Sequence, residues 1–253
     1  MPLLKHANRM TVGVIALILL GACSPQRDVS SAATGIHDPY ERQNRGVHAF
    51  NRKLDRAIVR PAGQGYTSVL PDEVEDSVSN FASNLGEPSN VVNNLLQGRL
   101  KNVGISTSRF VINTVLGLGG LFDAASEFGV SEVDTDFGET LHVWGVGEGT
   151  YLELPIAGPS TQRDTAGMVV DLFTNPLSYI LDSPEQYYSP LAGGASRIGD
   201  RGRFADTIDG ILYESADSYA QARLIYLQNR RFELGQEDAA SEIDPFALDT
   251  EGF

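Results

Sequence analysis

Cysteine, histidine and tryptophan are scarce in this 253-residue chain, which contains one, four and one of them. A lone cysteine has no partner for an internal disulfide, and an unpaired thiol is a liability in an oxidising compartment. His37, His48 and His142 lie far apart in the sequence, and the His-Glu-x-x-His pattern of a zinc-binding helix is missing. We therefore expect no metal and no other cofactor.

Recognisable catalytic motifs are missing as well. The sequence has no Gly-x-Ser-x-Gly elbow, and the glycine-rich run 145–149 has neither a phosphate-loop lysine nor the spacing of a dinucleotide fingerprint. Glu148 would repel a phosphate, so a plain turn is the better interpretation. His142, flanked by Glu139 and Trp144, could act as a base, although a lone histidine is more often structural. We expect a protein that is not an enzyme.

Basic residues are outnumbered by acidic ones, and the formal net charge is −14. Such a chain repels phosphate backbones, so nucleic acid is not expected as a partner. The same charge opposes electrostatic adsorption to anionic lipid, so any membrane attachment must come from apolar groups or acyl chains.

Long hydrophobic runs are also missing, but the N-terminus carries a short one. Lys5 and Arg9 precede the uncharged stretch 11–20, which is too short for a stable transmembrane helix and has the layout of an export signal. Leu20-Gly21-Ala22-Cys23 resembles the lipobox of bacterial lipoproteins, which are cut before the cysteine and acylated on it. An ordinary secreted protein and an uncleaved anchor helix are the alternatives.

Acylation would remove the free thiol of Cys23 and fasten the chain to the outer membrane on its periplasmic face. Two or more acyl chains make an anchor effectively permanent. The residue after the cysteine is Ser24, and the absence there of aspartate, an inner-membrane retention signal, favours the outer membrane.

Composition divides the chain into four parts. Residues 1–22 are expected to be the signal peptide, and residues 23–37, which are small and polar, a lipidated flexible tether. Residues 38–234 are long enough for one domain, and residues 235–253, with six acidic and no basic side chains, are expected to be a disordered tail.

Helical periodicity dominates the central part. Pro39 is placed for a first helical turn, Pro88 is expected to open a helix that Gly98 ends, and Thr161 with Asp164 resembles a capping box. The stretch 204–226 reads as one long amphipathic helix. Residues 150–154 alternate like a strand that has nothing to pair with. The predicted fold class is all-α.

The helix predicted from the pattern after Arg109 is apolar around its full circumference from Phe110 to Phe122, with glycines at 117, 119 and 120. Such a helix is either buried in a core or faces lipid, and this one is too short to span a bilayer. The residue pattern leaves both readings open.

Several segments occur together in an order typical of one family. They are Asp38-Pro39-Tyr40-Glu41, Asn44-Arg45, Phe50-Asn51, Val59-Arg60-Pro61, Ser79-Asn80-Phe81, Asn84-Leu85, Glu87-Pro88, 94–98, Arg109-Phe110, Asn113-Thr114, 117–120, Asp123, 136–141, Trp144-Gly145-Val146, 151–155, Gly158-Pro159-Ser160 and Arg163-Asp164. This set resembles the VacJ/MlaA family of outer-membrane phospholipid-transport lipoproteins over residues 38–232. His48 departs from the aromatic or bulky apolar residue usual there, and residues 183–203 match poorly.

The resemblance implies a single ring-like helical domain embedded in one membrane leaflet, with an amphipathic channel through its middle. It also implies removal of misplaced phospholipid from the outer leaflet, hand-over to a periplasmic carrier protein for retrograde transport to the inner membrane, and association with a trimeric porin. This activity would maintain the lipid asymmetry of the outer membrane.

Candidate channel or lipid-binding residues follow from polar side chains next to apolar or glycine-rich sequence. They are Arg109, Asn113, Arg163 and Asp164, although the last two could simply cap a helix. Candidate lipid-facing or turn residues are Phe110, Leu116, Gly117, Leu118, Gly119, Gly120 and Leu121. An envelope scaffold that binds porins without moving lipid, and a lipid-modifying enzyme, are the competing functions.

Overall fold

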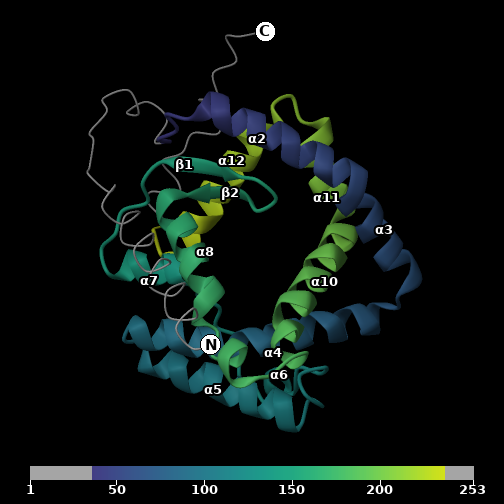
Figure 1. The fold of residues 1–253 in the computed structure, drawn as a ribbon, viewed down its shortest axis with the longest axis vertical. Helices are drawn as coiled ribbons and strands as arrows, with labels where there is room; N and C mark the ends of the chain where they lie inside the picture. The colour runs from purple at the N-terminus through teal and green to yellow at the C-terminus, as the bar shows by residue number, and fades with distance from the viewer. Residues whose placement is uncertain (1–35, 237–253) are drawn as a thin grey trace, which may run out of the picture.

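The computed structural model describes residues 36–236, and nearly all regular structure in them is helical (Figure 1). The predicted tether, the lipidation site Cys23 and residues 237–253 lie outside the described residues. In chain order the elements are α2 (Glu41–Leu54), the π-helix η2 (Asp55–Val59), α3 (Arg60–Val69), α4 (Asp72–Leu96), α5 (Leu100–Val115), α6 (Ala124–Glu127), α7 (Phe137–Val143), β1 (Tyr151–Leu154), β2 (Gly158–Thr161), α8 (Gln162–Thr174), α9 (Leu177–Ile180), η3 (Glu185–Tyr187), α10 (Tyr188–Arg203), α11 (Ala205–Asp209), the π-helix η4 (Gly210–Glu214) and α12 (Ser218–Glu233).

These elements close into a ring. Helix α2 continues through η2 into α3, which packs against α10, and α10 packs against α4. Helix α4 contacts α7 and α8, α8 contacts β2, which pairs with β1, and β1 contacts α2. The chain thus returns to its starting helix around a centre that no helix crosses in Figure 1. The predicted all-helical, ring-like domain is confirmed.

The prediction that a helix opens at Pro88 is wrong, because Pro88 lies inside α4. The helix begins sixteen residues earlier, after Pro71, whose extended backbone (ψ 151°) and the acidic first turn with Asp72 and Glu73 provide an earlier start. Packing against α5 and α10 carries it through Pro88 to Leu96. Gly98, in the left-handed conformation at φ 73°, follows the helix end as predicted.

The stretch 204–226 is not one helix, which is a second correction. It divides into α11, the π-helical turn η4 and α12, with Ser215 in an extended conformation (ψ 148°). The Asp217 side chain accepts a hydrogen bond from the Ala220 amide and so starts α12 afresh. Hydrophobic spacing of three and four persists across the break, so periodicity alone could not reveal it.

The predicted strand has a partner, which is a third correction. β1 and β2 form an antiparallel hairpin in which Tyr151 lies opposite Thr161 and Leu154 opposite Gly158. β2 contains glycine and proline and no alternating pattern, so sequence periodicity does not mark it. Thr161 ends the hairpin and caps α8, because its hydroxyl accepts from the Asp164 amide as the capping-box pattern predicted.

Glycines allow two of the helix pairs in the ring to touch through their backbones. A Cβ added to Gly63 in α3 would lie 2.8 Å from the amide nitrogen of Gly202 in α10. A Cβ added to Gly167 in α8 would lie 2.2 Å from the amide nitrogen of Gly138 in α7. Small residues at crossings let helices approach closely, as they do in membrane helix pairs. Among residues 36–236, no helix has the length and apolar character needed to cross a membrane.

Candidate functional site

The polarity of the domain is inverted relative to an ordinary globular protein. Among the described residues, eight apolar side chains are buried, against twenty-one polar or charged ones. Thirty large apolar side chains are exposed. Soluble proteins bury apolar groups and rarely expose so many large ones. An interior of paired polar groups with an apolar exterior is the arrangement expected of a protein surrounded by lipid.

Helix α4 shows this inversion along one element. Its buried residues are two glutamates, at positions 75 and 87, and four asparagines, at 84, 90, 93 and 94, whereas Leu95 and Leu96 at its C-terminal end are exposed. The apolar residues at the end of α4 therefore do not form its buried face. The asparagines bond to neighbouring elements, as when the Asn93 amide donates to Asp171 at 3.1 Å. Hydrogen bonds from these amide groups thus help to fix α4 in the ring.

The exposed apolar side chains are dense on two segments. The first runs from the end of α5 through the following turn, with Val111, Val115, Leu116, Leu118, Leu121 and Phe122. The second covers the end of α8 and α9, with Leu172, Phe173, Tyr179 and Ile180. Together we call them the apolar rim. Leaving both segments in water would cost roughly 25 cal/mol for each Å² of apolar surface, so a lipid environment suits them.

The turn after α5 explains why glycines occur there. Leu118, Gly119 and Gly120 all have positive φ, and a Cβ on Gly120 would lie 2.5 Å from the Asn84 side chain. Leu116, Leu118, Gly119 and Leu121 are exposed, Phe110 is half-buried, and Gly117 and Gly120 are buried. Lipid contact by these residues remains a prediction.

Arg109 and Asn113 lie together inside the domain. Arg109 donates to Glu87 at 2.8 Å, to the Val130 carbonyl at 2.6 Å and to Asp123 at 3.2 Å, and is only 2% exposed. Asn113 donates to Asp123 and accepts from the Ala125 amide. The cluster joins α4, α5 and the start of α6, with donors and acceptors paired.

Arg163 and Asp164 form a second buried cluster on another side of the ring. Asp164 accepts from Arg163, Tyr226 and Arg230, and Arg230 also pairs with Asp136. Burial alone would raise the pKa of Asp164, but the charges of Arg230 and Arg163 outweigh it, so its pKa lies below the usual range. The cluster fixes α12 against the start of α8.

The four candidate channel residues therefore occupy two separate clusters and are between 2% and 8% exposed. Their polar groups bond mainly to other protein groups, so their first role in this fold is to hold helices together. A contribution to a channel wall remains a prediction. The signal that sequence reasoning missed is the set of partners from distant segments, namely Glu87 for Arg109 and Tyr226 and Arg230 for Asp164.

His48, noted only as a departure from the family pattern, lies at a junction of α2, β1 and α12. Its Nδ1 is 3.1 Å from Glu153 Oε1 and its Nε2 is 3.1 Å from Ser218 Oγ. With the proton on Nδ1, the imidazole donates to the carboxylate and accepts from the serine hydroxyl. All three residues are buried.

A serine, histidine and carboxylate in this order also occur in hydrolases, but the neighbourhood of Ser218 opposes that chemistry. A nucleophile needs amide donors aimed at a developing oxyanion. The amide of Ala220 at the start of α12 instead donates to the carboxylate of Asp217, whose charge would repel an oxyanion. The three residues are better suited to joining α2, β1 and α12.

His142 and the glycine-rich run 145–149 lie close together in the sequence, and the structure shows the surroundings of each. His142 is half-buried, and burial followed by the charge of Arg163 lowers its pKa, which favours the neutral form. Gly145 and Gly149 have φ of 87° and 75°, and Glu148 pairs with Arg231. The run forms a turn, in agreement with the plain-turn interpretation.

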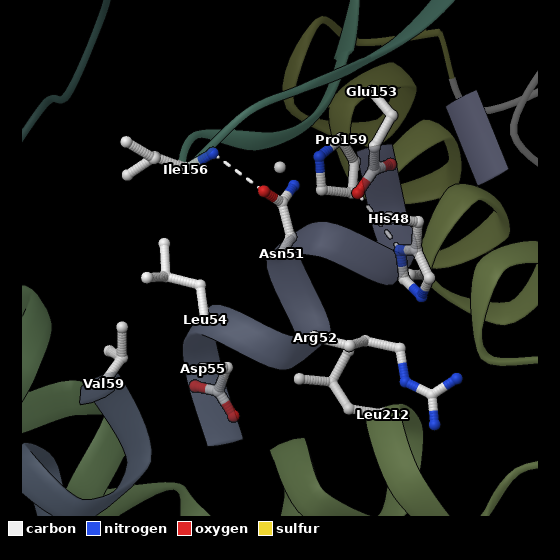
Figure 2. A pocket seen from close by; sticks show the side chains of 12 residues that line it. His48, Asn51, Arg52, Leu54, Asp55, Val59, Glu153, Ile156, Pro159 and Leu212 are labelled. Carbon is white, nitrogen blue, oxygen red and sulfur yellow. Dashed lines mark hydrogen bonds and ion pairs between the residues drawn. The ribbon is translucent and has the colours of Figure 1, made fainter. Parts of the chain in front are cut away.

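A pocket of about 230 Å³ lies between α2, η2, the β1–β2 hairpin, η4 and α12 (Figure 2). Its apolar lining includes Leu54, Val59, Ile156, Pro159, Leu212 and Ala222. Its polar lining includes His48, Asn51, Arg52, Asp55 and Glu153. The pocket therefore offers one apolar surface with polar groups at its side, which suits an amphiphile better than a wholly polar ligand.

Comparison with known proteins places this geometry in context. A family model described as MlaA lipoprotein matches residues 36–233. The intermembrane phospholipid transport system lipoprotein MlaA of Escherichia coli (strain K12) is 35% identical over 219 residues, which cover 85% of this chain and 84% of that protein. The protein of the same name from Haemophilus influenzae is 31% identical over 225 residues, which cover 87% and 88%.

Two further matches extend the comparison. An uncharacterized protein of Rickettsia bellii is 39% identical over 196 residues, which cover 77% of this chain and 76% of that protein. A solved structure reported as the structural basis for maintenance of bacterial outer membrane lipid asymmetry is similar with a TM-score of 0.67 and 35% identity. The match covers 78% of this chain and 98% of the solved chain.

Proposed function

Because the chain belongs to the MlaA lipoprotein family, we propose that it removes misplaced phospholipids from the outer leaflet of the outer membrane and returns them toward the inner membrane. Relatives named as intermembrane phospholipid transport lipoproteins support the transport part of the proposal. The structural observation that carries it is the inverted polarity of the ring.

The inverted polarity suits a ring that lies in one leaflet. The apolar rim would contact acyl chains, and the buried polar clusters would hold the helices together where no water is present to pair with them. Acyl chains on Cys23, as the lipobox predicts, would hold the protein on the periplasmic face.

A passage through the ring would serve the charged headgroup of the lipid. Carrying an unpaired charge through hydrocarbon costs at least a few kcal/mol. A polar path bordered by an apolar exterior lowers that cost while the tails remain in an apolar environment. Delivery to a soluble periplasmic carrier protein and association with a trimeric porin belong to the same proposal.

Deletion of the gene tests the proposal. Cells without the protein should accumulate phospholipid in the outer leaflet, measured by covalent labelling of surface aminophospholipids, and become sensitive to detergent. The intact gene should restore both properties. Unchanged leaflet composition would refute lipid removal and favour the scaffold that only binds envelope partners.

Arg163→Glu separates a channel role from a structural one. If Arg163 contributes to the lipid path, the variant should lose outer-leaflet clearance at unchanged protein abundance. If it only holds α8, abundance should fall in parallel with clearance, because Asp164 would lose a buried partner and face a like charge. Abundance and clearance are measured in the same cells.

A further inference from the structure

The pocket beside α2 combines an apolar lining with nearby positive charge. Segment 41–59, which forms α2 and η2, contains five basic residues and two acidic ones in a chain of net charge −14. A concentration of guanidinium groups in an acidic protein marks a place where an anion is favoured. The basic residues are Arg42, Arg45, Lys53, Arg52 and Arg56.

Arg52 and Arg56, unlike Arg45, have no acidic partner within the described residues. Arg45 pairs with Glu41 and Asp217, whereas Arg52 and Arg56 form no ion pair in that part of the chain. Their guanidinium carbons lie 5.7 Å and 4.7 Å from the centre of the Tyr213 ring. Cation–π contact holds a guanidinium in place but leaves its hydrogen-bond donors available.

Arg52 is the arginine that also lines the pocket. Its Nε is buried and makes no hydrogen bond to the protein. A buried donor without a partner costs free energy unless a ligand or water satisfies it. In Figure 2, Arg52 and Leu212 lie on one flank of the pocket, and Leu54, Val59 and Ile156 on the other.

Ile156 at the tip of the hairpin is the second unusual feature of the pocket. It is 80% exposed and has φ of 70°, a conformation that is strained for a β-branched residue. Asn51 holds it there, since its Oδ1 accepts from the Ile156 amide at 2.8 Å and its Nδ2 donates to the Leu154 carbonyl at 2.9 Å. An apolar side chain is thereby fixed in the pocket wall.

We propose that this pocket binds one phospholipid, with its phosphate on Arg52 and the first part of an acyl chain against Leu54, Val59 and Leu212. Ile156 covers the chain from the hairpin side. A pocket of about 230 Å³ accommodates a segment of one chain and not a whole lipid, because a water-sized group takes roughly 30 Å³. The inference deepens the proposed function, on which it rests, by assigning a headgroup residue.

Binding of a fluorescent phosphatidylglycerol to the purified full-length protein in detergent tests the proposal. Arg52→Met should weaken binding about tenfold or more, because a charge-assisted bond to phosphate is lost, and Arg52→Lys should retain part of the affinity. Arg42→Met is the matched control, since it removes an exposed positive charge from the same helix and should leave binding unchanged.

The apolar half of the site is tested without a change of charge. Ala222→Phe places a large side chain in the pocket and should abolish binding while the thermal melting curve remains cooperative. Lysophosphatidylglycerol should compete for the site, whereas inorganic phosphate or laurate alone should compete weakly. Strong competition by either one alone would show that only a phosphate or only a fatty acid is recognised, which overturns the proposal.

The outcomes separate this inference from the proposed function. Binding that is equal in wild type, Arg52→Met and Ala222→Phe would overturn the pocket assignment and leave lipid removal intact. If the purified wild-type protein binds no phospholipid, and cells without the protein keep a normal leaflet composition, both the pocket assignment and lipid removal are overturned.

Discussion

Gly167 in α8 lies directly on Gly138 in α7, so closely that a Cβ on Gly167 would come within 2.2 Å of the Gly138 nitrogen and 2.6 Å of its Cα. The two backbones touch, and the neighbouring cluster of Asp164, Arg230 and Asp136 joins the same part of the ring. Backbone contact and buried ion pairs thus act together where apolar packing is sparse.

Gly167→Ala should therefore destabilise the domain. Overpacking typically costs about 1–3 kcal/mol, and here the obstruction is backbone that cannot rotate away. Gly193→Ala in α10 is the matched control, because nothing lies within 4 Å of its added Cβ, and it should be neutral or stabilising by up to about 1 kcal/mol. Thermal melting in detergent measures both, and equal melting temperatures would contradict the contact.

Loss of Arg109 should be severe. Arg109→Met leaves Glu87 buried without its cation, and breaking a buried pair costs about 3–5 kcal/mol. Adding Glu87→Met should recover part of the loss, since the unpaired charge is then gone. Arg45→Met, whose partners Glu41 and Asp217 are both partly exposed, should cost no more than about 1 kcal/mol. Chemical unfolding of the wild type, Arg109→Met, Glu87→Met, the double variant and the control measures these differences. Losses from the two single changes that add up in the double variant would refute the coupling.

Asn51→Ala should release the hairpin tip. The change removes two hydrogen bonds to the hairpin backbone, at a cost of about 1–3 kcal/mol, and frees Ile156 from its strained conformation. Limited proteolysis should then cleave within residues 154–158, while Asn229→Ala, which breaks an exposed bond on α12, should not change the cleavage pattern. Identical digests would show that Asn51 does not hold the tip.

Ser218 should not react as a catalytic serine. Its hydroxyl is buried, and Asp217 accepts from an amide that would otherwise favour an oxyanion. Incubation of the full-length protein with a fluorophosphonate probe, followed by mass spectrometry, should detect no label on Ser218. A stoichiometric adduct there that is lost in His48→Phe would establish a hydrolase-like site and contradict the assignment of a structural role.

Sequence reasoning predicted the helical class, the ring and the cap formed by Thr161, because these depend on local patterns and on the family resemblance. It failed where tertiary contacts decide. Pro88 lies inside α4 because packing continues the helix on both sides of it. The buried face of α4 escaped detection because ordinary rules place apolar groups inside, and in this ring the buried groups are mostly polar.

In the candidate site, too, local sequence patterns predicted some features and tertiary contacts decided the others. Arg109 and Asp164 stand out in the sequence as charges beside apolar or glycine-rich residues, but their partners Glu87 and Arg230 are 22 and 66 residues away. Only the fold brings them together. The pocket was missed because no single segment marks it, and Leu212, Ile156 and Arg52 come from three separate elements.

Depth-dependent quenching tests most directly whether the apolar rim lies in lipid. With Cys23 acylated, Leu118→Cys or Leu172→Cys supplies the one free thiol for a fluorophore, and Asn229→Cys, at an exposed polar position in α12, is the control. In bilayers with nitroxide-labelled lipid, the account predicts strong quenching at positions 118 and 172, at depths within one leaflet, and little at 229. If an aqueous quencher quenches the fluorophores at all three positions and the nitroxide-labelled lipid quenches none of them, the apolar rim does not lie in lipid.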